Sequence, residues 1–305
     1  MPVATGTAAS QSALVTSLIS FLTTAAPSGP GWTLLASNTT PYSYTESNGT
    51  VSTVTAEYYL KAPGLSGTES IYLQAQAFDN ASVGYYNVRL RGATGYNSAQ
   101  NWFNQPGASP DTFIHLWSNS IPYTFIANGQ RCLVVAQVGS IYETAYFGKF
   151  LPYGTPGQYP YPVAVGGTSI SPTLLYSDTT NNHSAFFDPV CMYVYTVAGT
   201  WAPFQNPVAG SHLNQIFPYS QNVTWLEANL DGSYPLFAVI LQTLPATFGS
   251  SNQGQNELGE LDGVLFVPGL GQSSGSTVTV GSQAYLVAQN AFRTGGNNFA
   301  AFIEA

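Results

Sequence analysis

Short segments in which apolar and polar residues alternate follow one another along most of the chain. In residues 70–78, for example, Ile71 and Leu73 alternate with Tyr72 and Gln74. A period of two places the two kinds of side chain on opposite faces of a strand, so this pattern predicts strands. Further strands are predicted at residues 32–35, 52–61, 85–90, 123–127, 131–138, 140–147, 190–197, 223–226, 236–244, 262–267, 277–280, 283–289 and 298–303.

Turn residues separate these segments and indicate how the strands connect. Asn128-Gly129-Gln130 stands between two predicted strands, and Asn-Gly is a strong hairpin signal. Gly281-Ser282 joins two later strands in the same way. Closely spaced strands with Gly, Asn or Pro between them predict an all-β chain of β-sandwich or jelly-roll type.

One segment near the N-terminus has a different period. Within residues 12–26, Leu14, Leu18 and Leu22 lie on one helical face, which predicts an amphipathic helix that ends at the Pro- and Gly-rich residues 27–31. A cleaved secretory leader is the alternative, although no Lys or Arg precedes the apolar run. No run reaches the length of a membrane span, so we predict none.

A proline-rich stretch interrupts the strand pattern near the middle of the chain. Residues 151–162 contain prolines at positions 152, 156, 160 and 162. Proline has no N–H to donate to a sheet, so this stretch is predicted to be a loop or a connection between domains. We therefore predict a helical segment at residues 1–31, a first β-sandwich domain at residues 32–162 and a second at residues 163–305.

Charge is scarce, and this changes the functional expectations. Only 7% of the residues are charged, against about a quarter in ordinary soluble domains, and the net charge is −8. A nucleic-acid groove needs a cluster of cations, and the closest pair here is Arg89 with Arg91, so nucleic-acid binding is not expected. An uncharged exterior suits burial against other subunits, and it equally suits carbohydrate binding.

Two groups of residues resemble catalytic patterns. Gly271-Gln272-Ser273-Ser274-Gly275 matches the Gly-x-Ser-x-Gly pattern, but such a serine needs a strand-to-helix turn, and here a predicted strand follows. Glu257, Glu260 and Asp262 form the densest acidic group, without a convergent nucleophile or base. We predict that the protein is not an enzyme and has no cofactor; hydrolysis of envelope polysaccharides or esters is the alternative.

The sequence also contains candidates for metal binding and for a disulfide. The polar run at residues 177–184, together with Asp188, could hold Ca²⁺ through oxygen ligands, although such runs are more often turns. No histidine has a zinc-ligand spacing, so no metal is predicted. Cys132 and Cys191 each lie in an apolar run, which predicts buried free thiols; a single disulfide is the alternative.

Aromatic residues in two loops are the candidate contact residues. Tyr153, Tyr159 and Tyr161 accompany the prolines of residues 151–162, and Trp102 and Trp117 flank a Pro-rich turn. Tyr and Trp are favoured at interfaces because they offer a large area with a polar handle. These five residues could contact another subunit or a glycan, or they could pack within the protein.

Several loops resemble segments of a structural protein family of tailed-bacteriophage virions. The similar segments are residues 91–96, 104–110, 151–162, 259–264 and 285–295, and the likeness extends from about Trp32 to the C-terminus. The resemblance implies a virion component that forms homo-oligomers and contacts other virion proteins. It does not distinguish capsid, neck, tail and baseplate, and it carries no catalytic residue.

The sequence therefore predicts a non-enzymatic structural component of a tailed-phage virion. A glycan-binding module that contacts the host surface is the alternative from another class, because an uncharged surface rich in Tyr and Trp would serve it equally well.

Overall fold

The strands form three antiparallel sheets in the computed structural model, which describes residues 1–178, 185–186, 191–203, 229–243, 256–268, 271–289 and 298–304. The predicted all-β, sandwich-like fold is confirmed. The predicted strand at residues 223–226 lies outside the described residues.

Each sheet combines strands that are distant in the sequence. Sheet A has the order β1 (Val3–Ala8), β8 (Ile121–Ala127), β9 (Arg131–Val138), β10 (Ile141–Lys149), β12 (Val163–Gly166), β13 (Met192–Tyr195) and β14 (Trp201–Pro203). Sheet B has the order β2 (Thr33–Asn38), β4 (Val51–Ala62), β5 (Ile71–Asn80), β6 (Tyr85–Ala93) and β7 (Thr112–Leu116), and β3 (Tyr42–Thr45) also pairs with β4. Sheet C has the order β11 (Leu151–Pro152), β16 (Asn256–Pro268), β19 (Asn298–Glu304), β18 (Gln283–Gln289) and β17 (Thr277–Val280), and β15 (Phe237–Thr243) also pairs with β16. The helical elements are α1 (Gln11–Thr23) and the short 3-10 helix η1 (Trp102–Asn104).

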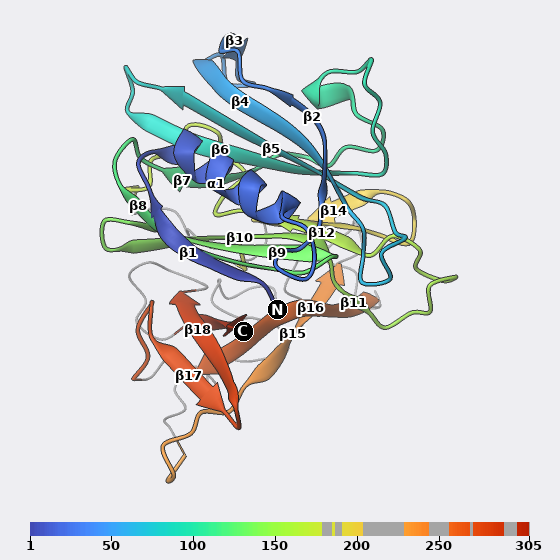
Figure 1. Cartoon of the computed structure of the whole chain (residues 1–305), viewed down its shortest axis with the longest axis vertical. Helices are drawn as coiled ribbons and strands as arrows, with labels where there is room; N and C mark the ends of the chain where they lie inside the picture. The colour runs from blue at the N-terminus through green and yellow to red at the C-terminus, as the bar shows by residue number, and fades with distance from the viewer. Residues whose placement is uncertain are drawn as a thin grey trace, which may run out of the picture.

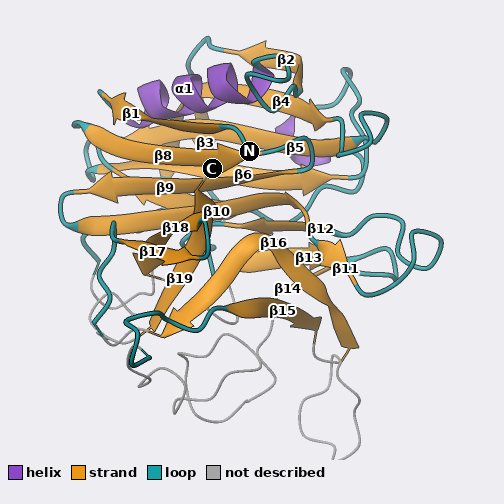
Figure 2. Ribbon diagram, turned by 60° about the horizontal axis from the view of Figure 1, so that its bottom comes forward, coloured by secondary structure: helices purple, strands orange, loops and turns teal. Residues whose placement is uncertain are grey.

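Sheet A is the middle of three layers (Figures 1 and 2). Val134 and Ala136 of β9 pack in the core shared with sheet B, whereas Leu133 and Val135 pack in the core shared with sheet C. Successive side chains of a strand point to opposite faces, so a strand buried on both faces needs an unbroken apolar run. This explains the sequence Cys-Leu-Val-Val-Ala within β9.

Helix α1 lies at the open side of the sandwich formed by sheets A and B (Figure 1). The Ser10 hydroxyl caps its N-terminus by accepting a hydrogen bond from the Ala13 N–H, at 3.2 Å. Leu14, Leu18 and Leu22 are buried in the core between the two sheets. The predicted helix is confirmed, and it ends at Thr23. Strand β1, which precedes it, was not predicted.

The proline-rich residues 151–162 do not separate the strands on either side of them. Strand β10 pairs with β12, so sheet A continues across this stretch. Within the stretch, Leu151 and Pro152 form β11 and pair with Glu260 and Gly259 of β16. The division into domains at residue 162 stays a prediction, whereas the pairing of strands from both sides is observed.

The Asn128–Arg131 hairpin connects all three layers. Trp32, just before sheet B begins, donates its indole N–H to the Asn128 carbonyl at 2.8 Å. Asp262 of sheet C accepts hydrogen bonds from the side chains of Asn128, Gln130 and Arg131, at 3.2, 2.9 and 3.1 Å. The Arg131 side chain is 1% exposed, so its charge depends on this carboxylate.

We therefore expect Asp262→Asn to destabilise the fold strongly. Neutralising Asp262 leaves a buried guanidinium without its counter-charge, which costs about 3–5 kcal/mol of unfolding free energy. Glu69→Gln is the matched control, because the Glu69–Lys149 pair is partly exposed and its loss costs about 1 kcal/mol or less. Urea denaturation of the two variants measures this difference, and equal losses would contradict the proposed role of the hairpin.

Candidate interaction surfaces

Two of the three tyrosines in the proline-rich loop face inward. Tyr159 is 3% exposed, its ring meets Phe150 edge-on at 5.5 Å, and its hydroxyl donates to the Tyr195 carbonyl. The Tyr161 hydroxyl donates to the Ala93 carbonyl of sheet B. Burial raises the pKa of both phenols above the ordinary value of a tyrosine. Both residues therefore attach the loop to the protein.

Tyr153 is the member of this group that a partner can reach. It is 51% exposed, and its hydroxyl donates to Oε1 of Glu260 at 2.9 Å. Trp102 is 1% exposed, and Trp117 is partly buried against Tyr176, with 5.3 Å between the ring centroids. The five predicted contact residues thus do not form one surface.

The catalytic candidates lie in the loop before β17 and on strand β16. Ser273 lies in a loop that leads into strand β17, and its carbonyl accepts a hydrogen bond from the Ser276 hydroxyl at 2.6 Å. Glu260 and Asp262 bind different partners, Tyr153 and the hairpin at Asn128. The side chain of Glu257, the residues around His183 with Asp188, and His212 lie outside the described residues.

The described part of the chain holds no group of three or more His, Cys, Asp or Glu residues that could bind a metal ion. It also contains no helix that is long and apolar enough to cross a membrane. Cys132 and Cys191 are buried thiols that form no disulfide, as predicted, and burial raises the pKa of Cys132.

The outer face of sheet B carries a buried charged network that the sequence analysis missed. Arg89 is fully buried; it donates to Oε2 of Glu46 at 2.5 Å and to Oε1 of Gln76 at 2.6 Å. Its guanidinium also lies 4.8 Å from the ring centroid of Phe78 and 5.4 Å from that of Phe113. Burial raises the pKa of Glu46, and the nearby guanidinium opposes this shift.

Strand pairing assembles this network from residues that are far apart in the sequence. Glu57, Gln76, Arg89 and Phe113 form one row across β4, β5, β6 and β7. The Tyr42 hydroxyl covers one end of the row and donates to Oε2 of Glu57 at 2.7 Å. Strand alternation could have indicated this network in the sequence. It places Gln74, Gln76, Arg89 and Arg91 on the same face of sheet B, the face that points away from the main core.

Most of the few basic residues form ion pairs within the protein. Arg293 is outside the described residues, and four of the other five basic residues pair with acidic side chains. These four are Arg89, Arg91, Arg131 and Lys149. The exterior therefore carries even less positive charge than the composition suggests.

The edges of the sheets are uncharged as well. Within the described residues, the strands at the ends of the three sheets contain no Asp, Glu, Lys or Arg. These strands are β1 and β14 in sheet A, β2, β3 and β7 in sheet B, and β11, β15 and β17 in sheet C. Soluble proteins commonly place charges on exposed edges to prevent pairing with another chain. Strand β7 is buried throughout, whereas β1 and β2 have exposed residues and lack that protection.

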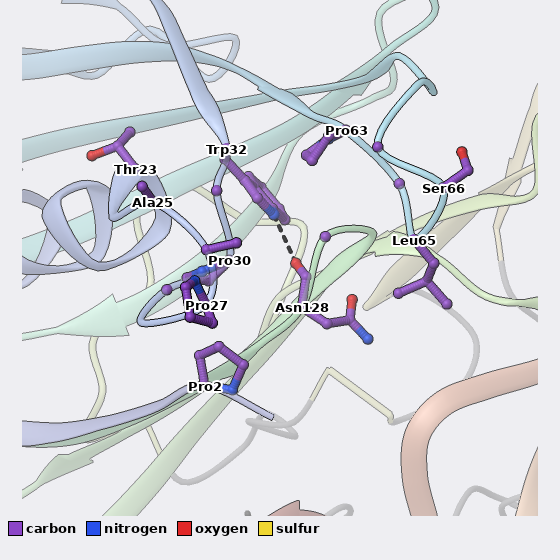
Figure 3. Close-up of a pocket in the computed structure, with 16 residues that line it drawn as sticks. Pro2, Thr23, Ala25, Pro27, Pro30, Trp32, Pro63, Leu65, Ser66 and Asn128 are labelled. Carbon is purple, nitrogen blue, oxygen red and sulfur yellow. Dashed lines mark hydrogen bonds between the residues drawn. The ribbon is translucent and has the colours of Figure 1, made fainter.

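An open groove of about 700 Å³ lies beside the hairpin at Asn128 (Figure 3). Its walls are the turn after α1, the loop at residues 63–67 and the hairpin itself. Pro2, Pro27, Pro30, Pro63 and Leu65 belong to its lining, and Leu65 is 67% exposed. None of the described lining residues is Asp, Glu, Lys or Arg. The groove thus extends the uncharged exterior.

Comparison with known proteins adds no relative. No protein-family model matches the chain, and no curated protein is significantly similar to it. The resemblance of the loops to phage virion proteins therefore stays a prediction.

We expect truncation of Tyr159 to lower the free energy of unfolding far more than truncation of Tyr153 does. Tyr159→Ala removes a buried ring and costs about 3–5 kcal/mol, as for other buried aromatic residues. Tyr153→Ala removes a half-exposed ring whose hydroxyl donates to Glu260, and it costs about 1 kcal/mol or less. Urea denaturation checks both values; a large loss from Tyr153→Ala would show that this ring, too, supports the fold.

Proposed function

We propose that the protein is a non-enzymatic structural component of a tailed-phage virion, which self-associates and contacts other virion proteins. The observation that carries the proposal is the absence of charged residues from the end strands of all three sheets in the described part of the chain.

Self-association is expected at the edges of the sheets. An edge strand presents unpaired N–H and C=O groups, which a strand of another chain can pair with. In strands β1 and β2, Thr5, Leu34 and Ser37 are exposed, and no charge among their residues opposes a second copy. A protein that must remain monomeric would carry lysines or similar groups there. A protein that assembles has no such need.

The assignment to a phage particle is supported by the loop resemblance. The similar segments include residues 91–96, 104–110 and 151–162. They connect or flank strands of sheets A and B, and the third supplies the exposed Tyr153. In the proposed assembly, such loops contact neighbouring virion proteins, while the sheet edges contact other copies of the chain.

Adding charge to an edge should weaken self-association. Thr5→Lys on β1 and Ser37→Lys on β2 each place a lysine at an exposed edge position, where burial against another copy would desolvate it. We expect the wild-type protein to sediment as an oligomer. At least one lysine variant should raise the dissociation constant about tenfold, which corresponds to about 1.4 kcal/mol.

Thr53→Lys is the matched control. Thr53 is exposed, but its strand β4 is paired on both sides at this position, with β3 and with β5. The same substitution there should leave sedimentation unchanged. A wild-type protein that stays monomeric at its highest soluble concentration would contradict the proposal, as would edge variants that associate like the wild type.

Assembly should also be insensitive to salt. The ion pairs described above are within the subunit and largely buried, so few charges between subunits remain to be screened. Light scattering should give the same mass in about 0.1 M and about 1 M NaCl, where the Debye length falls from about 10 Å to about 3 Å. Dissociation at the higher concentration would show that ion pairs hold the subunits together.

A further inference from the structure

A second pocket, polar and distinct from the proline-lined groove, lies at the outer end of sheet C. It encloses about 300 Å³ between the turn at residues 229–234, the loop at residues 271–276 and strand β17. Figure 1 shows β17 and the orange turn at the end of the molecule away from sheet B. The volume is at the lower end of the range for small-molecule sites.

Hydrogen bonds fix both walls of this pocket. In the turn, Oδ1 of Asp231 accepts from the Ser233 N–H at 2.9 Å and from its hydroxyl at 2.6 Å. In the loop, the Gly275 N–H donates to the Val287 carbonyl of β18 at 2.8 Å. The walls are therefore formed before any ligand binds, which lowers the entropic cost of binding.

The pocket presents hydrogen-bonding groups that the protein itself does not use. Among the described residues, Nε2 of Gln272 and the hydroxyls of Thr277 and Thr279 have no hydrogen-bond partner. Tyr234 adds an aromatic residue to the described lining, which includes no charged residue.

This combination selects a class of ligand. Among the described lining residues, an anion would find no basic side chain, and it would lie near the Asp231 carboxylate that is bound to Ser233. An apolar ligand would leave the amide and hydroxyl groups unpaired. A sugar ring has hydroxyls that both donate and accept, as Gln and Thr side chains do, and apolar C–H groups that can face an aromatic ring. We propose that this pocket binds a neutral sugar unit, a property that goes beyond the structural role proposed above.

The test is binding of single neutral sugars to the full chain. D-glucose, D-galactose, D-mannose and N-acetyl-D-glucosamine are titrated separately and followed by ligand-detected NMR. We expect at least one to bind saturably in the millimolar range. Gln272→Ala and Thr279→Val should each weaken that binding about fivefold or more, because each removes a hydrogen bond to the ligand.

Thr53→Val, which makes the same change on the distant sheet B, should leave binding unchanged. D-glucose 6-phosphate is the charged comparison and should bind no better than glucose. The proposal is overturned if none of the four sugars binds saturably, if the pocket variants bind like the wild type, or if Thr53→Val weakens binding equally. Sugar binding does not depend on the oligomeric state. These titrations therefore test the sugar proposal and not the assembly proposal.

Discussion

The contact of Asp262 with the hairpin at Asn128–Arg131 is the interaction on which the three-layer arrangement depends. The carboxylate comes from sheet C, the three donors come from sheet A, and the same hairpin accepts the Trp32 indole N–H at the start of sheet B. Gly263, next to Asp262, has a φ of +76°, and a Cβ there would lie 2.0 Å from a guanidinium nitrogen of Arg131. The close approach of sheets A and C at this point therefore needs glycine.

A common principle links this contact to the outer face of sheet B. In both places a buried arginine is neutralised by a carboxylate that is distant in the sequence, Asp262 for Arg131 and Glu46 for Arg89. Buried pairs of this kind add little net stability, but they strongly penalise any arrangement that separates the partners. The Arg131–Asp262 pair thus specifies how sheets A and C fit together, whereas the Arg89–Glu46 pair lies on the outer face of sheet B.

The sequence predicts elements best where the signal is local. Strands β17 and β18 follow from alternation around the Gly281-Ser282 turn, and helix α1 from the spacing of its leucines. Strand β1 lacks such a signal and is held by its pairing with β8, more than a hundred residues later in the chain. The burial of Tyr159 depends on Phe150 and Tyr195, and the polar pocket unites residues 232–234 with residues 271–279. Such proximity arises from sheet topology, which residue patterns along the chain do not encode.

The pairing of β1 with β8 also constrains the order of events during synthesis. Val3 pairs with Ile126 and Ala8 with Ile121, so a newly made strand β1 has no partner strand until more than 110 further residues have been translated. At about 5–20 residues per second, this interval lasts on the order of ten seconds. An uncharged strand is exposed throughout, so nascent chains on one messenger RNA are at risk of pairing with each other. Spacing between ribosomes, or a chaperone that covers the emerging strand, would determine the yield of correctly folded chains.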